Sequence, residues 1–277
     1  MLTKNSLTVY PELHRIISRG ASFIYLQPHP ALKKFISNYT ITFPSEDMLS
    51  EDYTVIPHGC STLVFGCDQT GIDAVLLGPA TQPVTVGDRA RTFDLVFIVE
   101  FQPAGLYQFT GIPQKELADR QLPFSVVHPQ LHRVIQQLLE TSDNLFNFIS
   151  SIDQLLLINM KNEYPQALAT AAAAVLKSQG TLSIKQLANQ TFYSERQLNR
   201  LANQHLGMSV KSFSRLVRVN KAVTLLENPY NSLTTIYRQT GYYDLPHFIH
   251  DFKATCALTP EEYRKKMSDF YSQIAKF

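Results

Sequence analysis

Short runs of β-branched and aromatic residues recur through the first third of the chain. They lie between residues 22 and 101, and turn residues such as Gly71, Pro79 and Gly87 separate them. Many short runs at this spacing predict the strands of a barrel or a sandwich. One segment, residues 30–36, has its apolar residues at helical spacing instead, which predicts a short helix packed on the sheet. The predicted strands are residues 22–26, 39–43, 53–57, 62–67, 74–77, 82–86 and 93–101.

The apolar period becomes helical after Phe101. Two short helices are predicted at residues 103–110 and 113–118, and an apolar stripe over residues 131–139 predicts a longer one. The helix that follows has Asp143 as its expected N-cap. Its apolar positions lie close to heptad spacing, which fits either packing on its own sheet or a seam between two copies of the chain. These positions are Leu145, Phe148, Ile149, Ile152, Leu155, Leu156 and Asn159.

A break at Pro165 separates the two kinds of pattern. An alanine-rich helix is predicted directly after it, over residues 166–177. We therefore place a domain boundary near residue 164, which divides the chain into residues 1–164, with a helical connector at about 128–162, and residues 165–277. The predicted fold class is α+β with two domains: a mostly β, barrel-like (cupin-like) domain with connector helices, and an all-α domain.

Two similar units are predicted in the C-terminal domain. Ser183 and Ser194 each open a capping box with a Gln three residues later, so a short helix, a turn and a second helix occupy about 183–206. The same layout returns at about 232–256, and one long helix, about 209–228, joins the units. This is the helix-turn-helix layout, whose second helix enters the DNA major groove. Two reading helices at a fixed spacing are therefore predicted.

Helical spacing identifies the candidate DNA contacts of the first unit. Leu198 and Leu201 must face the core, which leaves polar side chains on the opposite side of the helix. Arg can pair with guanine and Asn with adenine through two hydrogen bonds each. The candidate DNA-binding residues of this helix are Arg196, Gln197, Asn199, Arg200 and Asn203.

The second reading helix offers fewer polar groups. With Phe248 and Phe252 directed inward, its exposed face contains mainly apolar residues together with His250 and Lys253. We therefore predict that the first unit provides most base recognition. The second unit touches phosphates through Lys253, His250 and its helix N-terminus, or makes apolar contact with thymine methyl groups.

The overall composition adds little to these predictions, whereas the distribution of charge along the chain bears on DNA binding. With 44% hydrophobic and 17% charged residues, the chain has the make-up of a globular protein, which excludes disordered tails and coiled rods. Residues 1–164 carry 11 Lys and Arg against 16 Asp and Glu, a balance of −5, and residues 165–277 carry 14 against 7, a balance of +7. A basic domain suits a phosphate backbone, and an acidic one is repelled by it. Charge thus favours DNA binding by the C-terminal half, with a solvated basic face as the alternative.

Membrane insertion and secretion are not indicated. No apolar stretch approaches the roughly 18 to 20 residues that a membrane helix needs, and the N-terminus lacks a basic segment leading into an apolar one. The three cysteines are an odd number without CxxC spacing, which fits neither a disulfide framework nor a zinc site. We expect a soluble protein in the reducing cytoplasm, with no membrane partner.

Catalytic and metal sites are not predicted either. The GxSxG, Walker A and GxGxxG patterns are absent, so no nucleophile and no cofactor cradle can be named. His29 and His58 lie in the strand region without a second ligand at metal-binding spacing. Cys60 and Cys67 are either small buried residues or a redox-responsive pair. We expect no catalytic residue, no metal and no cofactor.

A ligand site in the β domain remains an alternative to plain core packing. Glu100 is a charge inside the apolar run 95–101 and needs a partner, either Arg89 or Arg91 or a cationic group of a ligand. If the strand alternates, this carboxylate simply lies on the wetter face. Glu100 and His58 are the candidate ligand-binding residues. Aromatic residues that fit a pocket or a core equally well are Tyr39, Phe43, Tyr53, Phe65, Phe97, Phe101 and Tyr107.

On these residues and motifs, the chain resembles the AraC/XylS family of transcription regulators. In the C-terminal half the resemblance rests on Leu187-Ala188, Ser194 to Leu201, Leu206 to Ser209, Arg215 to Leu226, Ile236, Thr240 to Tyr242, His247-Phe248, Phe252-Lys253 and Leu258 to Arg264. In the N-terminal half it rests on Ile56 to Phe65, Leu77 to Pro79, Val99 to Gly105 and Glu116 to Arg120, which resemble the effector domain of one subgroup.

The resemblance implies DNA binding by two helix-turn-helix units, an N-terminal domain that senses a ligand or mediates dimerisation, and activation through RNA polymerase. It also implies that base-reading positions fall on Arg196, Asn199 and Arg200. The chain departs from the family at three positions. Phe192 and Ala257 stand where loop glycines are usual, and Ala202 stands where an aromatic residue is usual.

The sequence therefore predicts a regulator that binds a double-stranded DNA operator and activates transcription in response to a small effector. RNA polymerase is an expected partner, and helices over about 131–160 are the expected seam of a homodimer. The alternative is a divergent family member that acts mainly as a protein-interaction module, with weak or no specific DNA binding.

Overall fold

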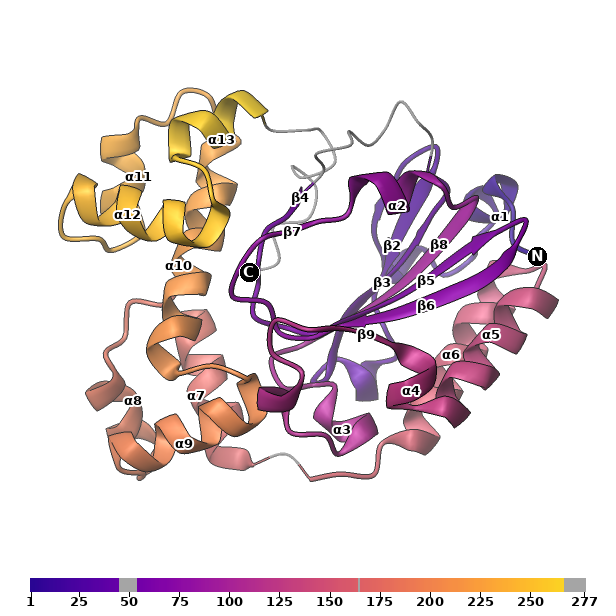
Figure 1. The fold of residues 1–277 in the computed structure, drawn as a ribbon, viewed down its shortest axis with the longest axis horizontal. Helices are drawn as coiled ribbons and strands as arrows, with labels where there is room; N and C mark the ends of the chain where they lie inside the picture. Colours follow the sequence, from indigo (N-terminus) through magenta and orange to yellow (C-terminus); the bar gives the residue numbers. More distant parts are fainter. Residues whose placement is uncertain (45–53, 164, 267–277) are drawn as a thin grey trace.

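A computed structural model of the chain describes residues 1–44, 54–163 and 165–266. It contains a β-rich N-terminal domain and a helical C-terminal region that stand side by side (Figure 1). The predicted fold class, α+β with a mostly β domain, connector helices and an all-α domain, is therefore confirmed. Residue 164, where the boundary was predicted, lies outside the described residues, and so does Tyr53.

The N-terminal domain is built on one curved antiparallel sheet of seven strands. Their order is β1-β2-β3-β8-β5-β6-β9, and β4 and β7 form a second, two-stranded sheet. The central strand β8 pairs with β3 on one side and β5 on the other. The strands are β1 (Ile16–Arg19), β2 (Phe23–Leu26), β3 (Ile36–Thr42), β4 (Thr54–Val55), β5 (Thr62–Asp68), β6 (Gly71–Leu77), β7 (Val84–Thr85), β8 (Leu95–Phe101) and β9 (Gln121–Pro123).

Two local predictions are wrong. The helix expected over residues 30–36 is a single turn, η2 (Pro30–Leu32), and Ile36 already begins β3, where it pairs with Phe101. Pairing with the central strand overrides the short helical period. The N-cap of the next long helix is Asn144 rather than its neighbour Asp143. The short edge strands β1 and β9 were missed because each offers only three or four residues of pattern.

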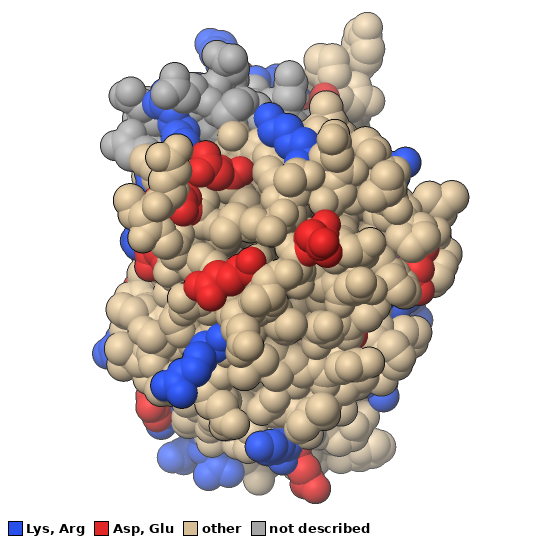
Figure 2. All heavy atoms as spheres, turned by 90° about the vertical axis from the view of Figure 1, so that its right-hand side faces the viewer, with Lys and Arg blue, Asp and Glu red and all other residues tan. Residues whose placement is uncertain are grey.

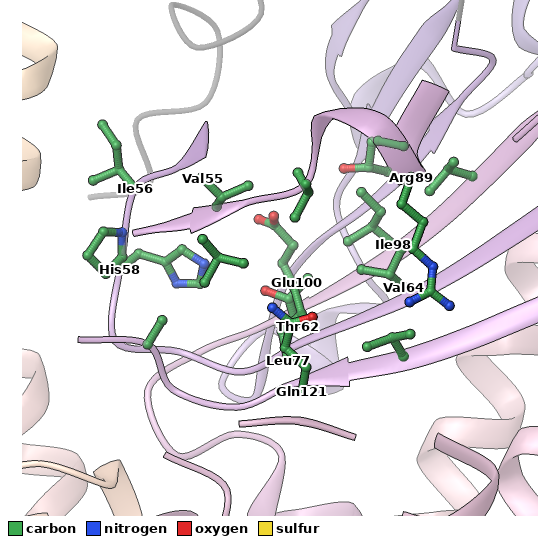
Figure 3. A pocket seen from close by; sticks show the side chains of 18 of the residues that line it. Val55, Ile56, His58, Thr62, Val64, Leu77, Arg89, Ile98, Glu100 and Gln121 are labelled. Carbon is green, nitrogen blue, oxygen red and sulfur yellow. The ribbon is translucent and has the colours of Figure 1, made fainter. Parts of the chain in front are cut away.

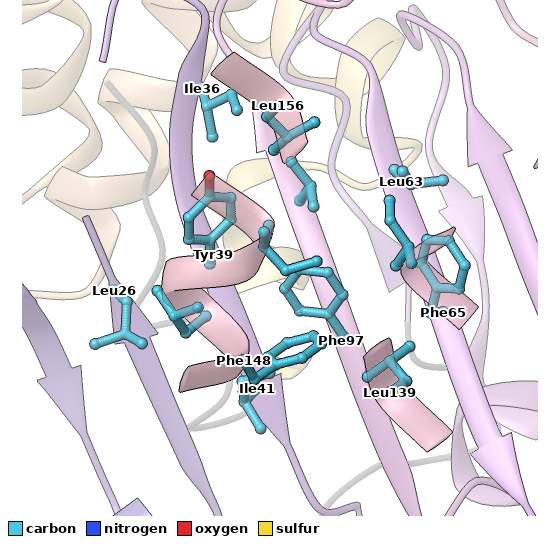
Figure 4. Close-up of a cluster of buried hydrophobic side chains, with 14 of the residues drawn as sticks. Leu26, Ile36, Tyr39, Ile41, Leu63, Phe65, Phe97, Leu139, Phe148 and Leu156 are labelled. Atoms are coloured by element: carbon cyan, nitrogen blue, oxygen red, sulfur yellow. The ribbon is translucent and has the colours of Figure 1, made fainter. Parts of the chain in front are cut away.

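Each strand of the sheet has two different faces. On β8, Phe97 and Val99 point toward helices α5 (Pro129–Thr141) and α6 (Leu145–Asn159), and they are fully buried in one apolar cluster (Figure 4). Ile98 and Glu100 point to the opposite face, where they line a cavity. The ring of Phe97 meets that of Phe148 edge-to-face, with 5.0 Å between the ring centroids. Burying such a side chain contributes about 1.5 to 3 kcal/mol.

The apolar stripe of α6 packs on its own sheet. Its five main residues are at most 1% exposed, so this alternative of the sequence analysis is confirmed and the stripe is closed to a second copy of the chain. A buried ion pair fixes α6 further, because Asp153 bonds Arg15 at 2.7 Å and accepts the Tyr39 hydroxyl at 2.9 Å. The five residues are Leu145, Phe148, Ile149, Ile152 and Leu156.

The remaining elements of the N-terminal domain are short. The helices predicted over residues 103–110 and 113–118 are present but shorter, as α3 and η3. The short helices are α1 (Lys4–Thr8), η1 (Leu13–Arg15), α2 (Gly87–Arg91), α3 (Tyr107–Thr110), η3 (Gln114–Glu116) and α4 (Phe124–Val127).

The C-terminal helices follow the predicted order. Both predicted capping boxes are present at Ser183 and Ser194. The long central helix buries the predicted side chains, among them Phe213, Leu216 and Val219. In Figure 1 this helix, α10, runs between two groups of smaller helices at its ends. The helices are α7 (Gln166–Lys177), α8 (Ile184–Thr191), α9 (Glu195–Leu206), α10 (Val210–Leu226), α11 (Leu233–Gln239), α12 (Leu245–Cys256) and α13 (Pro260–Lys266).

Two departures from the family pattern lie at left-handed turns. Phe192 ends α8 with φ 58°, and Ala257 ends α12 with φ 60°. The turn geometry is thus kept without glycine, at a steric cost of roughly 1 to 2 kcal/mol for each residue with a Cβ. The Phe192 side chain is 96% exposed, so no packing against the protein compensates this cost.

Ala257→Gly is therefore predicted to raise the free energy of unfolding by about 1 kcal/mol, because glycine adopts this conformation without a Cβ clash. Ala254→Gly, three residues earlier inside α12, is the matched control and should lower it by about 1 kcal/mol. Urea unfolding of the full chain, followed by circular dichroism, measures both. Destabilisation by both substitutions would contradict the account of this turn.

Candidate functional site

The second helix of the first unit, α9, begins at a neutral and fully formed cap. The Ser194 hydroxyl accepts the backbone N–H of Gln197 at 3.2 Å, and the Gln197 side-chain oxygen accepts the N–H of Ser194 at 3.0 Å. Gln197 is exposed, but its carbonyl oxygen is occupied by this cap. The cap itself carries no charge, and the carboxylate at this helix end is that of Glu195 in the first turn.

Two arginines and an asparagine stand on the open side of α9. Arg196, Arg200 and Asn203 are exposed, whereas Leu198 and Ala202 on the opposite side are 0% exposed. Arg196 and Arg200 are four residues apart and so lie on the same side, one turn from each other. This arrangement offers two guanidinium groups to a negatively charged or guanine-bearing surface.

Asn199 has a structural partner that the sequence did not indicate. Its side-chain oxygen accepts the backbone N–H of Val210 at 3.1 Å, which ties α9 to the first turn of α10. Reading adenine through two bonds uses that same oxygen. Contact between Asn199 and DNA stays a prediction, and a bidentate contact would require the bond to Val210 to break.

The second reading helix, α12, begins at a charged cap. Asp244 accepts the N–H of His247 at 2.8 Å, so a carboxylate lies at the end where a phosphate was predicted to bind. His250 and Lys253 are exposed as predicted. His250 lies 3.7 Å from the buried carboxylate of Asp251. The two units therefore differ in the residue that caps the reading helix as well as in the side chains on its open side.

Sequence reasoning missed several exposed cations because they lie outside the two reading helices. Lys185 stands in the first turn of α8, Lys211 in the first turn of α10, and Arg238 at the end of α11. Contacts to phosphates need no particular helix, so their only sequence signal is the net charge of this half. These three are further candidates for backbone contacts.

A cavity of about 330 Å³ lies on the other face of the sheet (Figure 3). Glu100 and His58 are both buried and both point into it, so the two sequence candidates line the same space. Arg89, considered as a partner of Glu100, instead forms an ion pair with Asp73. Most of the surface is apolar, from Val55, Ile56, Val64, Val75, Leu77, Val84, Val96, Ile98 and Val223.

The helix that joins the two units, α10, closes one side of this cavity. Asn220 and Val223 of α10 both line it. The Asn220 amide donates hydrogen bonds to the carbonyl of Pro57 at 3.0 Å and to that of Leu216 at 2.9 Å. Asn220 is 6% exposed and so joins the loop between β4 and β5 to the helix that carries both units.

The same loop, together with α3 and η3, makes further contacts between the two halves. Gly59 has φ 69°, and a Cβ there would lie 3.1 Å from Leu216. At the other end of the interface, the His205 ring of α9 meets the Tyr107 ring edge-to-face, with centroids 4.8 Å apart. Burial lowers the pKa of His205, which favours the neutral form of this imidazole against the tyrosine ring.

The sheet lies between the cavity and three of the predicted pocket aromatics. It also lies between the two cysteines that were considered as a redox pair. Tyr39, Phe65 and Phe97 belong to the cluster under α5 and α6, and they do not line the cavity. Cys67 lies in that cluster, where burial raises the pKa of its thiol to about 11, whereas Cys60 lines the cavity. A protonated thiol on the opposite face gives no support to a redox-responsive pair.

The described residues contain neither a membrane-spanning helix nor a cluster of metal ligands. Within residues 1–44, 54–163 and 165–266, no helix is long and apolar enough to cross a membrane. In the same ranges, no group of three or more His, Cys, Asp or Glu side chains could hold a metal ion.

Comparison with known proteins finds relatives for both halves. Residues 187–266 match a helix-turn-helix domain family, and residues 25–123 match a domain of unknown function, DUF6597. An uncharacterized HTH-type transcriptional regulator of Haemophilus influenzae is 28% identical over 158 residues, which cover 51% of this chain and 53% of the relative. The match thus spans about half the length of that relative.

Solved structures give weaker similarities. An AraC-type transcriptional regulator from Chromobacterium violaceum is 28% identical, covers 36% of this chain and 91% of its own, and has a TM-score of 0.34. ToxT from Vibrio cholerae O395 is 13% identical, covers 80% of this chain and 96% of its own, and has a TM-score of 0.44.

The role of Asn199 can be tested through stability. Asn199→Ala is predicted to lower the free energy of unfolding by about 1 kcal/mol, because the N–H of Val210 loses its partner. Asn199→Asp keeps an acceptor oxygen and should lose less, and Asn203→Ala, on the exposed side, should change little. Chemical unfolding of the three variants gives the values. Equal losses for Asn199→Ala and Asn203→Ala would show that the bond to Val210 does not contribute to the stability of the fold.

Proposed function

This chain belongs to the AraC family of HTH-type transcription regulators, and on that basis we propose that it binds operator DNA mainly through α9. The observation that carries the proposal is the open pair Arg196 and Arg200 on a helix whose other side is fully buried. Both side chains stand near the capped N-terminus, the part of a reading helix that enters the major groove. Arg196 and Arg200 read bases, and Gln197 and Asn203 flank them.

The charge distribution also supports DNA binding by the helical half of the chain. Residues 165–277 carry a balance of +7 and residues 1–164 a balance of −5, so the β-rich half is repelled by the polymer that the helical half attracts. The face that carries α5 and α6 is largely without charged groups, with a few carboxylates near its centre (Figure 2). DNA therefore approaches from the helical side.

In the proposed division of labour, residues 1–164 sense an effector in the sheet cavity and residues 165–277 bind DNA. The helices over about 131–160 join two copies of the chain through their remaining exposed surface. Ile158 is 74% exposed and lies outside the buried stripe of α6, so it belongs to that surface. Activation in the cytoplasm through contact with RNA polymerase is what the family resemblance implies for such a protein.

A second candidate function is a protein-interaction module, and one observation favours it. Large aromatic side chains stand in the turns of both units, with Phe192 96% and Tyr243 92% exposed. Exposed aromatics are enriched where proteins bind one another. An apolar interface weakens little with salt, whereas binding through several phosphate contacts weakens steeply, so salt dependence separates the two functions.

Selection of bound fragments from randomised duplex DNA by the full-length protein, at near-physiological salt, tests the proposed function. We expect an enriched motif that Arg200→Ala blurs at one or two positions, with a loss of about 1 to 3 kcal/mol at the base it contacts. Lys161→Ala, in the N-terminal half, serves as the control and should leave the motif unchanged. Failure to enrich any motif, together with binding that is insensitive to salt, would favour the protein-interaction module.

The second unit makes a different prediction. Lys253→Ala should weaken binding to all duplexes alike and reduce the dependence of affinity on salt by about one released ion, because Lys253 contacts a phosphate. Fluorescence anisotropy at several salt concentrations, on the selected motif and on an unrelated duplex, provides the measurement. A loss confined to the selected motif would instead make Lys253 a base reader.

A further inference from the structure

Two histidines of the second reading helix lie beside one buried carboxylate. Asp251 of α12 is 7% exposed, and its oxygens lie 3.6 Å from Nε2 of His247 and 3.7 Å from Nδ1 of His250. From α10, the guanidinium group of Arg218 approaches the same carboxylate at 3.8 Å. Both histidines are exposed, so this cluster joins the interior of the second unit to the open side of its reading helix.

Aromatic packing fixes the geometry of this cluster. The His247 ring meets the Tyr242 ring edge-to-face, with centroids 5.2 Å apart, and the Arg218 guanidinium lies 4.6 Å from the centre of the same tyrosine ring. Burial raises the pKa of Tyr242, so its hydroxyl keeps its proton at neutral pH. The cluster is therefore held from three places: α10, the turn before α12, and α12 itself.

The charge of this surface depends on its imidazole groups. Imidazoles gain or lose a proton between about pH 5 and 8, whereas arginine and aspartate side chains keep their charge over that range. Arg218 and Asp251 carry opposite charges, and so do Lys253 and Asp244 on the same helix. Protonation of both histidines therefore takes the sum over these groups from zero to +2. Further fixed charges on the elements packed against α12 are Arg215 of α10, Arg238 of α11 and Glu262 of α13.

The equivalent position of the first unit carries a permanent charge. Arg200 stands six residues after its cap, Ser194. His250 stands six residues after the cap of the second unit, Asp244. His247 lies three residues before His250 and so on the same side of the helix. A phosphate near these rings favours their protonated form, because an imidazolium ion can donate both of its N–H groups and forms charge-assisted hydrogen bonds.

Taking DNA binding in the proposed function as its basis, we infer that the second unit binds the phosphate backbone through the protonated forms of His247 and His250, so that DNA binding takes up protons. Asp251 is a positioning residue, because it holds both rings beside α10 from the buried side of the helix. The first unit binds through arginines, whose charge does not depend on pH. DNA affinity therefore rises as the pH falls from 8 to 6, and it rises for all duplexes alike, because phosphate contacts carry no sequence information.

Salt dependence at two pH values tests the inference. Fluorescence anisotropy on the full-length protein, with the selected motif and with an unrelated duplex, gives the slope of log affinity against log salt at pH 6 and at pH 8. We expect the slope to be steeper at pH 6 by about one to two released ions on both duplexes, one for each histidine that contacts a phosphate. Equal slopes at the two pH values, with DNA bound, overturn the inference.

Substitutions assign the pH effect to α12. His250→Gln stays polar but cannot gain a charge, so it should reduce the difference between the two slopes by about one ion. His250→Arg is charged at both pH values and should make the slope at pH 8 steeper by about the same amount. The matched control, His14→Gln, changes an exposed histidine of the N-terminal domain and should keep the full difference. The His250 side chain is 78% exposed, so both variants should fold, which thermal unfolding checks. A full difference in His250→Gln contradicts the assignment.

Calorimetry measures the proton uptake itself. Titration of the selected duplex at pH 7, in two buffers of different ionisation enthalpy, gives the number of protons taken up on binding. We expect about one proton for the unmodified chain and fewer for His250→Gln. Asp251→Asn should also reduce the uptake, and an unchanged uptake in that variant contradicts its positioning role. If Asp251→Asn does not fold, the two His250 variants still decide the inference. DNA binding without proton uptake overturns this inference alone, whereas a failure to bind any duplex at pH 6 and at pH 8 overturns the proposed function.

Discussion

The structure depends on the burial of one helix, α10, on three sides. Val210, Phe213 and Leu216 complete the core of the first helix-turn-helix unit. Val219, Ala222 and Leu226 complete the core of the second unit. The third side, through Asn220 and Val223, meets the loop before β5 and the sheet cavity. Movement of α10 relative to the sheet would therefore disturb the cores of both units, because packed cores of this kind shift between discrete arrangements and do not deform continuously.

The two units share one plan but not one chemistry. The first has a neutral serine cap and two exposed arginines, which suit base reading, whereas the second has an aspartate cap and few polar groups on its open side. Two equal readers would specify bases in both of the major-groove segments that they enter. The asymmetry seen in the chain is consistent with one unit that specifies the sequence and another that adds affinity and orientation.

Much of the C-terminal half could be predicted from the sequence because its signals are local. Capping boxes at Ser183 and Ser194 and the apolar period of α10 each lie within a few residues, so tertiary context changes little. Features that depend on contacts between residues far apart in the sequence could not be predicted from it. The bond from Asn199 to Val210, the pairing of Ile36 with β8 and the helix wall of the cavity all join segments whose proximity only the fold reveals. Glu100 and His58 were identified because they are ionisable residues in an apolar strand region, although no pattern showed that they line the same cavity.

The central claim, that α9 lies in the major groove with its arginine side against the bases, has a direct test. All three native cysteines are buried, so a single new cysteine at Asn203→Cys can carry an iron chelate that cleaves nearby DNA. The same chelate at Gln154→Cys, exposed on α6, is the control. The account predicts cleavage confined to a few adjacent nucleotides of the bound site from position 203 and none from position 154. Diffuse cleavage from position 203, or cleavage from position 154 alone, would contradict it.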